Sequence, residues 1–505
     1  MKRNYFVCCL IALLGSLNMQ AFDFEVDGIY YTVTGKDSVS VVAGTNLYGG
    51  SVTIPATVKN DTLEYKVAAI DSKAFYYCTD LTSVIIPEGV EKIDYAAFRN
   101  CSGLTSVALP ASIKKMGNAV FFGCSSLASV TLPDNLTAIE PYTFFACKNL
   151  TTVSVPASVR RIGGSAFGDC KALTSVNIPV GITEIASHTF ENCSALTSVV
   201  IPVGVTDIGD YAFQNCSALT SVVIPAGVTQ LGRCAFFGCN LASVTIPATV
   251  KLLVSSTFGS CPNLSTISVE SGNTKYSAEG NALIETIVDD KTSDITKRLV
   301  MGCASTVIPD GVTEIGRCAF ENCNGLTSIT IPASVTSIED YAFSSCTDLT
   351  SVTILEGLTD IGNYAFAGCE NLESISLPAS TATIGDEAFA QCSGLKVVTC
   401  NAIKCPKASS DAFLSISEDA VLFVPSASYD EYARTDPWKQ FLNIDVIENN
   451  MVAEERDAET AITSLEGFGK IQQVYQLGGQ QTSRLQRGIN IVRMSDGTTR
   501  KVLVK

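Results

Sequence analysis

Apolar side chains return at a fixed interval along most of this chain. Phenylalanine recurs every 23 residues, with one step of 22 and one of 62. A cysteine follows each of these phenylalanines by three residues, and a leucine follows the cysteine by three in every repeat but one. The thirteen repeated phenylalanines are Phe75, Phe98, Phe121, Phe144, Phe167, Phe190, Phe213, Phe236, Phe258, Phe320, Phe343, Phe366 and Phe389. Such a period is typical of proteins built by stacking one small structural unit.

Each unit contains the pattern Leu-x-x-Val-x-Ile, in which apolar and polar positions alternate. Alternation with period two predicts a short strand whose leucine, valine and isoleucine face inward. A proline such as Pro87 or Pro110 ends the strand, because proline cannot donate to the ladder. One unit cannot bury its own apolar side, whereas thirteen stacked units can. We therefore predict a repeat solenoid of 23-residue units, with a parallel β-sheet on one face and the phenylalanines stacked in a core column.

The repeated unit resembles the BspA-like bacterial surface leucine-rich-repeat family. Residues 319–332, Ala-Phe-Glu-Asn-Cys-Asn-Gly-Leu-Thr-Ser-Ile-Thr-Ile-Pro, carry the resemblance, and it extends over about residues 50–447. The resemblance implies a curved or flattened leucine-rich-repeat solenoid on the cell surface and a role in adhesion.

The N-terminal segments depart from the repeat. Residues 1–21 have the pattern of a secretory signal peptide, with two basic residues, an apolar stretch of about a dozen residues, and Ala21 at the cleavage position. That stretch is too short to span a bilayer comfortably. Residues 22–70 predict an N-terminal β cap, in which residues 24–33 and 38–42 form two strands around a turn. Repeat arrays need such a cap to cover an open core end.

The solenoid is expected over residues 71–400, followed by a C-terminal cap over 401–447 that Trp438 helps to seal. The long step between two phenylalanines leaves about 16 residues in excess of two ordinary units. We interpret the segment near 270–305 as a strand, a turn and a strand that project from the array as a hairpin. A long excursion of this kind is a functional candidate, although a plain spacer loop is the alternative.

The end of the chain predicts a separate small module. Residues 448–461 are acidic and polar, which is typical of a linker. Residues 462–505 contain three strand-rich blocks and predict a small C-terminal β-domain. This tail resembles the C-terminal sorting domain of the type IX secretion system, which implies contact with that secretion machinery; Gln476 and Asn490 depart from the usual pattern. An ordinary β-module is the alternative.

The net charge and the single histidine limit the ligands and the catalytic or metal sites that we expect in this chain. The net charge of −16 argues against binding nucleic acid or anionic lipid, because both require a basic surface. His188 is the single histidine, and the residues at its place in other repeats vary widely, which we interpret as a surface position under no structural demand. One histidine excludes a multi-histidine metal site. We predict no catalytic, cofactor or metal site, and hence a protein that is not an enzyme.

The cysteines repeat with the unit, so we interpret the thirteen of them as buried free thiols that act as small apolar groups. They lack the pairs two to four residues apart that zinc sites use. Cys400 and Cys405 are the better disulfide candidates, because they lie close together in the expected C-terminal cap of an exported protein.

The outward positions of the predicted strands define a candidate binding face. One row is nearly all serine and threonine, and the second contains a mild apolar island at Val200 and Val223. The candidate protein-binding residues are Asn177, Val200, Val223, Thr245, Thr330 and Thr353. A face kept small so that strands pack evenly is the alternative. Tyrosines on the coil turns form a second candidate, namely Tyr142, Tyr211, Tyr341 and Tyr364.

Together these features predict a secreted or outer-cell-surface protein of a Gram-negative bacterium, without a membrane span or a cofactor. The expected function is that of an adhesin whose solenoid contacts host matrix or cell-surface proteins. A passive structural or shielding surface protein is the alternative.

Overall fold

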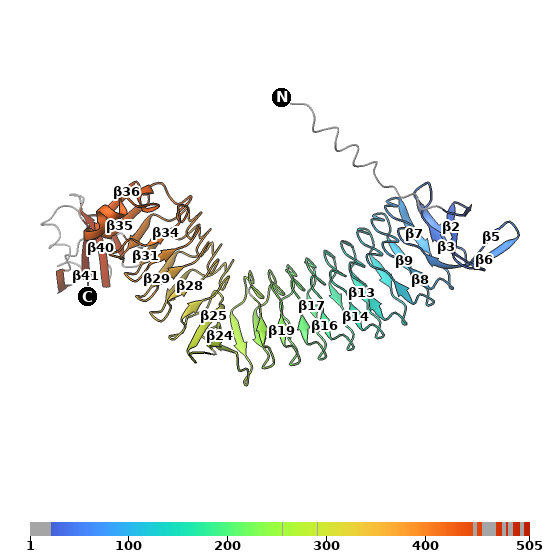
Figure 1. Cartoon of the computed structure of the whole chain (residues 1–505), viewed down its shortest axis with the longest axis horizontal. Coiled ribbons are helices and arrows are strands. Elements are labelled where there is room, and N and C mark those ends of the chain that lie inside the picture. The colour runs from blue at the N-terminus through green and yellow to red at the C-terminus, as the bar shows by residue number, and fades with distance from the viewer. Residues whose placement is uncertain are drawn as a thin grey trace, which may run out of the picture. The chain divides into compact units, whose positions relative to one another are not determined.

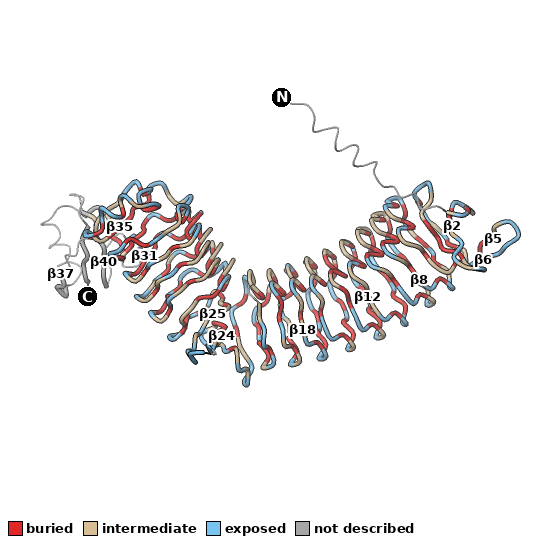
Figure 2. Tube along the Cα trace, viewed as in Figure 1, coloured by how far each residue is buried: buried red, intermediate tan, exposed pale blue. Residues whose placement is uncertain are grey.

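The computed structural model describes residues 22–254, 256–289, 291–447, 452–456, 471–476, 481–482, 488–494 and 499–504 (Figure 1). The predicted signal peptide lies outside the described residues. The chain divides into two compact units, residues 1–219 and 220–505. Both are parallel β-solenoids in which buried positions recur along every coil (Figure 2). The predicted fold class is therefore confirmed. None of the described helices is long and apolar enough to cross a membrane.

Each repeat of the first unit contributes one strand to a parallel sheet and a second, shorter strand that pairs in parallel on the return side of the coil. The strands that carry the Leu-x-x-Val-x-Ile pattern form what we call the main sheet: β4 (Gly50–Thr53), β7 (Leu81–Ile85), β9 (Ser106–Ala108), β11 (Ser129–Thr131), β13 (Thr152–Ser154), β15 (Ser175–Val176) and β17 (Ser198–Val199). Two-residue strands on the way back belong to the return side: β8 (Lys92–Ile93), β10 (Lys115–Met116), β12 (Ala138–Ile139), β14 (Arg161–Ile162), β16 (Glu184–Ile185) and β18 (Asp207–Ile208). Val107 pairs with Val130 and Val130 with Val153, so the register advances by one repeat per strand.

The N-terminal cap joins the return side. β1 (Phe24–Val26), β2 (Ile29–Val33) and β3 (Ser38–Val42) are antiparallel, and β3 then runs parallel to β6 (Leu63–Ile70). β6 pairs with β8 and, antiparallel, with β5 (Thr57–Asn60). The expected strand over residues 24–33 is thus two strands. The chain reverses between them at Asp27 and Gly28, which both have positive φ, a conformation that glycine adopts without steric cost.

The phenylalanine column is present as predicted. In the first unit the rings from Phe75 to Phe213 lie 4.8 to 5.6 Å from their neighbours and are nearly parallel. Tyr48 extends the column at its start, 4.5 Å from Phe75. Of the thirteen repeated cysteines, eleven are buried thiols as expected, and Cys261 and Cys323 are partly exposed. The repeated thiol can also donate a hydrogen bond: Cys101 Sγ lies 2.9 Å from the carbonyl oxygen of Phe75 in the preceding coil. The thiol therefore ties adjacent coils together.

The turn around each phenylalanine has a backbone requirement that the sequence analysis missed. The residue two positions before the ring has positive φ in every repeat; it is Tyr142 at 60° in one coil and His188 at 60° in another. Its N–H donates to a carbonyl of the next coil, as from His188 to Asp210 at 2.9 Å. Ala96 and Ala119 at this position are buried. The interpretation of a position without structural demand is therefore wrong: the backbone is held, and only the side chain varies.

The second unit repeats the same arrangement. Its main-sheet strands are β20 (Ser243–Ile246), β22 (Thr266–Val269), β27 (Ser328–Ile331), β29 (Ser351–Ile354), β31 (Ser374–Leu377), β33 (Val397–Cys400), β35 (Val421–Pro425) and β36 (Asn443–Ile447). Its return strands are β19 (Gln230–Leu231), β21 (Leu252–Leu253), β26 (Glu314–Ile315), β28 (Ser337–Ile338), β30 (Asp360–Ile361), β32 (Thr383–Ile384) and β34 (Lys407–Ala408). Phe413 stacks on Phe389 at 5.3 Å, so coils continue beyond residue 400.

The excess residues of the long step form three antiparallel strands, β23 (Tyr276–Glu279), β24 (Ala282–Val288) and β25 (Ile295–Met301). A hairpin is present, but it does not simply project from the array. β25 runs parallel to β26, so the insertion is built into the return side. The reason is that β25 exposes a backbone edge whose register matches the next return strand.

The C-terminal segments close the second unit. Trp438 is fully buried, and its indole N–H donates to the carbonyl of Pro406 at 3.1 Å. The helical part of the cap is a single turn, α2 (Tyr429–Tyr432). The tail forms a sheet of β37 (Val452–Arg456), β38 (Ile471–Gln476), β39 (Gln481–Thr482), β40 (Gly488–Met494) and β41 (Thr499–Val504). β37 lies within residues 448–461, the segment predicted as a linker, and its backbone pairs with the edge of β41.

Candidate protein-interaction surface

The outward side of the main sheet is exposed and mostly hydroxylated in the first unit. In β9, β11 and β13 the residues on either side of the buried valine are exposed. The exposed residues there are Ser106, Ala108, Ser129, Thr131, Thr152 and Ser154. Short side chains on strands about 5 Å apart make this face shallow and without charge.

Asn177 and Val200 occupy neighbouring coils of this face, next to the register pair Val176 and Val199. Val200 is 79% exposed and has no polar group to satisfy. The amide of Asn177 instead holds the backbone of Val155, accepting from its N–H and donating to its carbonyl, each at 2.9 Å. Of these two predicted residues, Val200 is free to contact a partner, whereas Asn177 already has a structural role.

Two further exposed valines lie on the same two coils, in the turns that follow the strands. Val180 is 83% and Val203 is 85% exposed, and both directly follow the proline that ends a strand. A Cβ placed on Gly204 would lie 3.6 Å from the carbonyl oxygen of Val180, so these two coils are in contact here. We call Val180, Val200 and Val203 the valine patch. Sequence reasoning missed two of its members because it examined only the strand positions; the repeated Ile-Pro-Val-Gly segment was the available signal.

The remaining predicted residues belong to the second unit and are also exposed. Val223 is 80% exposed. The hydroxyl of Thr245 lies 2.8 Å from that of Ser268 on the next coil. Thr330 and Thr353 are paired in register on β27 and β29. These positions present hydroxyl groups, and Val223 presents an apolar side chain.

At the end of the second unit, the chain itself covers the outward side of the main sheet. Phe423 of β35 is buried against Tyr475 of β38, with ring centroids 6.2 Å apart. Burial raises the pKa of Tyr475, and Arg493 lies 3.9 Å from Asp445. The outward side is therefore a surface on which a strand with an aromatic side chain can pack.

Tyr211, Tyr341 and Tyr364 of the coil turns each stack on the equivalent ring of a neighbouring coil. His188 stacks on Tyr211 with centroids 4.7 Å apart, and its Nδ1 lies 2.9 Å from Glu191. Tyr341 and Tyr364 stack at 4.9 Å. Stacking follows from the repeated positive φ, which directs equivalent side chains the same way on successive coils. His188 thus has a carboxylate and an aromatic ring as neighbours.

The eighteen described cysteines are free thiols. Cys400 accepts a hydrogen bond from the hydroxyl of Tyr432 at 3.2 Å, and burial raises its pKa to about 11. Cys405 is a free thiol too, so the candidate disulfide is not formed in this structure. Within the described residues, no group of three or more histidine, cysteine or acidic side chains could hold a metal ion.

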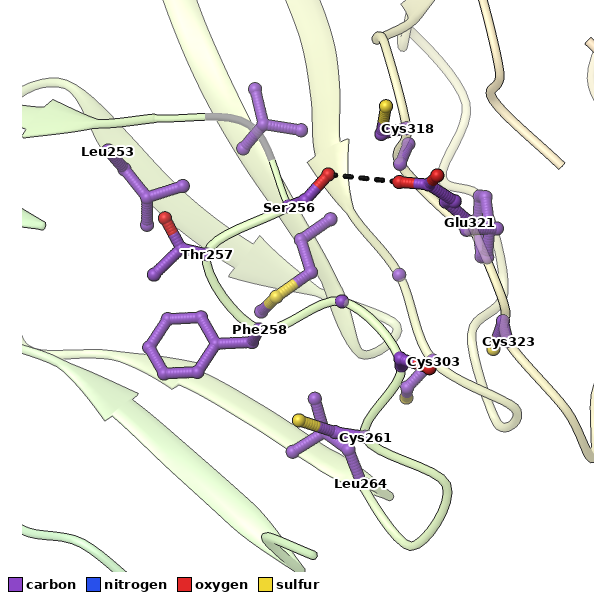
Figure 3. Close-up of a pocket in the computed structure, with 17 residues that line it drawn as sticks. Leu253, Ser256, Thr257, Phe258, Cys261, Leu264, Cys303, Cys318, Glu321 and Cys323 are labelled. Atoms are coloured by element: carbon purple, nitrogen blue, oxygen red, sulfur yellow. Dashed lines mark hydrogen bonds between the residues drawn. The ribbon is translucent and has the colours of Figure 1, made fainter. Parts of the chain in front are cut away.

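A small pocket marks the break in the phenylalanine column (Figure 3). Gly302 occupies the position of a repeated phenylalanine. Its N–H donates to the carbonyl of Ala319, just as the N–H of Phe320 donates to the carbonyl of Ala342. A Cβ on Gly302 would lie 2.0 Å from the ring of Phe320, which fills the vacated space. Ser256 donates to Glu321 at 3.2 Å across the pocket. The remaining cavity is about 20 Å³, which holds at most one water molecule.

The fold and this shallow face define the class of protein: a leucine-rich-repeat solenoid. Residues 68–197, 183–306 and 293–418 match the model of the BspA type leucine rich repeat region, over more than half of the chain. The chain belongs to the BspA type leucine-rich-repeat family. Proteins built on this repeat commonly bind other proteins.

Several solved structures are similar to this chain. A leucine-rich repeat protein from Bacteroides ovatus is 26% identical with a TM-score of 0.55, covering 85% of this chain and 100% of that one. A leucine rich cell surface protein from Faecalibacterium prausnitzii is 26% identical, with a TM-score of 0.49 and coverages of 85% and 95%. The T. pallidum leucine rich repeat protein is 32% identical over 39% of this chain and 91% of that one, with a TM-score of 0.36. No curated protein sequence matches the chain.

Proposed function

We propose that this protein is a non-enzymatic binding scaffold that contacts a protein partner through the outward side of its main sheet. The valine patch is the observation that supports this most strongly. Three valines that are 79% to 85% exposed lie on two adjacent coils, one on the outward side of the main sheet and two in the turns that follow its strands. A cluster of exposed apolar side chains inside a polar rim is the usual anatomy of a protein interface.

The flat shape favours a broad, shallow contact with another polypeptide. The net charge of −16 disfavours nucleic acid. Within the second unit, the packing of Tyr475 on Phe423 gives an internal example of a strand that covers this side of the sheet. These observations support a partner that brings an aromatic or aliphatic side chain onto the valine patch.

The finer proposal concerns location and partner. Residues 1–21 would direct export and residues 462–505 would serve as a sorting signal, so that the protein reaches the surface of a Gram-negative cell. There it would act as an adhesin for host matrix or cell-surface proteins. A passive shielding protein is the second candidate, and the even packing of short side chains on the main sheet favours it.

A capture experiment separates the two candidates. The exported chain, residues 22–505, is immobilised and challenged with purified matrix proteins, and Val200→Glu is compared with Thr131→Glu, which places the same charge at the equivalent position three coils away. An adhesin should retain at least one matrix protein, and only Val200→Glu should weaken retention. A shielding protein would retain none, and equal effects of the two variants would exclude the valine patch as the site.

A further inference from the structure

A groove in the N-terminal cap borders the first strand of the main sheet. The β1–β2 turn, residues 46–49 and β4 enclose a space of about 490 Å³. Pockets that hold small ligands or short peptide segments are of this size. The groove lies entirely in the first unit, and the valine patch contributes none of the residues that line it.

β4 forms one wall of this groove and is the last strand of its sheet. Among the described residues it pairs only with β7. The N–H of Gly50 donates to Asp80, and that of Ile54 donates to Ile85. Because successive residues of a strand point their backbone groups to opposite edges, the N–H and C=O of Ser51 and Thr53 point away from β7. An unpaired edge of this kind is a template for another strand.

The walls of the groove add chemical preferences to this edge. Leu47 is 68% exposed at its rim, and Tyr48 is buried at its base. Glu25 and Asp27 are the two charged side chains that line it, and both are exposed. Gly49 and Gly50 carry no side chain, so the start of β4 is open to an approaching backbone. The groove thus combines backbone donors and acceptors, an apolar contact and a negative rim.

We propose that the edge of β4 binds an extended segment of a partner polypeptide as an added strand. Main-chain hydrogen bonds to Ser51 and Thr53 hold the segment, and the groove selects its side chains, as in other cases of strand addition. A basic side chain of the segment lies against Glu25 and Asp27. This surface is separate from the valine patch and binds whether or not that patch has a partner.

The test uses residues 22–505 and a positional-scanning library of fluorescein-labelled octapeptides, with binding followed by fluorescence polarisation. Enriched peptides should carry a basic residue and alternating apolar residues. Thr53→Pro removes the outward N–H without removing a bond to β7, and should weaken binding of the enriched peptide about tenfold. Thr53→Ala keeps the N–H and should bind as the parent does. N-methylation of the peptide at alternate positions should reproduce the loss.

Charge reversal supplies a second readout that requires no change in the strand. The double variant Glu25→Lys and Asp27→Lys should shift the library preference from basic to acidic residues, whereas Val200→Glu should leave it unchanged. The proposal is overturned if no peptide is enriched, if Thr53→Pro and Thr53→Ala behave alike, or if the charge preference persists. Concentration-dependent dimers in sedimentation velocity that Thr53→Pro abolishes would assign the edge to a second copy of the chain instead.

Discussion

Replacing Phe167 with alanine removes one ring from the middle of the phenylalanine column. The ring is fully buried, and its centroid lies 5.5 Å from that of Phe144 and 5.6 Å from that of Phe190. The side chain thus contacts both neighbouring coils and fills the core between them. In a solenoid each coil contacts just its neighbours, so this loss has no distant compensation.

The magnitude follows from the area removed from water. A buried phenylalanine covers about 150 to 200 Å², which at about 25 cal/mol per Å² corresponds to roughly 4 to 5 kcal/mol. Partial collapse of the neighbouring rings into the vacated space reduces this loss of free energy, and the loss of two stacking contacts increases it. We expect Phe167→Ala to lower the free energy of unfolding by about 3 to 5 kcal/mol, as for other buried phenylalanines.

Urea unfolding followed by circular dichroism measures this change. Tyr142→Ala is the matched control, because Tyr142 is an aromatic residue of a neighbouring coil that is 46% exposed, and its removal should cost less than about 1 kcal/mol. Phe167→Ala should also broaden or split the transition, since the array is weakened at one place. If the two variants lose the same stability, the ring does not carry the packing assigned to it.

Three further predictions concern the scaffold. Burial raises the pKa of Cys193 to about 12, so the folded chain keeps a proton that the unfolded chain loses above about pH 8.5. The free energy of unfolding should therefore fall as the pH rises from about 8.5 towards 12. In urea titrations, Cys193→Ala should make this dependence on pH less steep by about 1.4 kcal/mol per pH unit. Gly302→Ala should cost about 1 to 3 kcal/mol in the same assay, because its Cβ meets the ring of Phe320; an unchanged midpoint would show that the ring can move aside. Asn177→Ala should cost about 1 to 3 kcal/mol by leaving the backbone of Val155 without partners, and a neutral result would assign the amide to the surface alone.

Most of the fold could be predicted from the period of the sequence. A fixed interval between phenylalanine, cysteine and leucine leaves stacking as the only way to bury them, so the column and the main sheet were predictable. The conformation of the coil turns could not be predicted. The positive φ two residues before each repeated phenylalanine constrains the backbone but not the side chain, so tyrosine, histidine and alanine all occur there. Asn100 and Asn192, two residues after the ring, have φ angles of 61° and 59°. Because asparagine tolerates positive φ, these asparagines were a signal of the backbone constraint in the turn.

The ends and the surface were less predictable. Phe413 follows Phe389 by 24 residues and Tyr48 replaces a phenylalanine, so a strict period misses both. β37 depends on a backbone edge supplied by β41, distant in sequence. Of the valine patch only Val200 was predicted, because Val180 and Val203 lie outside the strand pattern. The domain limits, the sorting role of the tail and the binding residues remain predictions.

Biolayer interferometry with a matrix protein, applied to the parent chain, Val200→Glu and Thr131→Glu, measures whether the valine patch holds a partner. We expect saturable binding whose dissociation constant rises at least about tenfold in Val200→Glu and is unchanged in Thr131→Glu. Saturable binding that is equal in all three proteins would contradict it, because the partner would then be held elsewhere than on the valine patch.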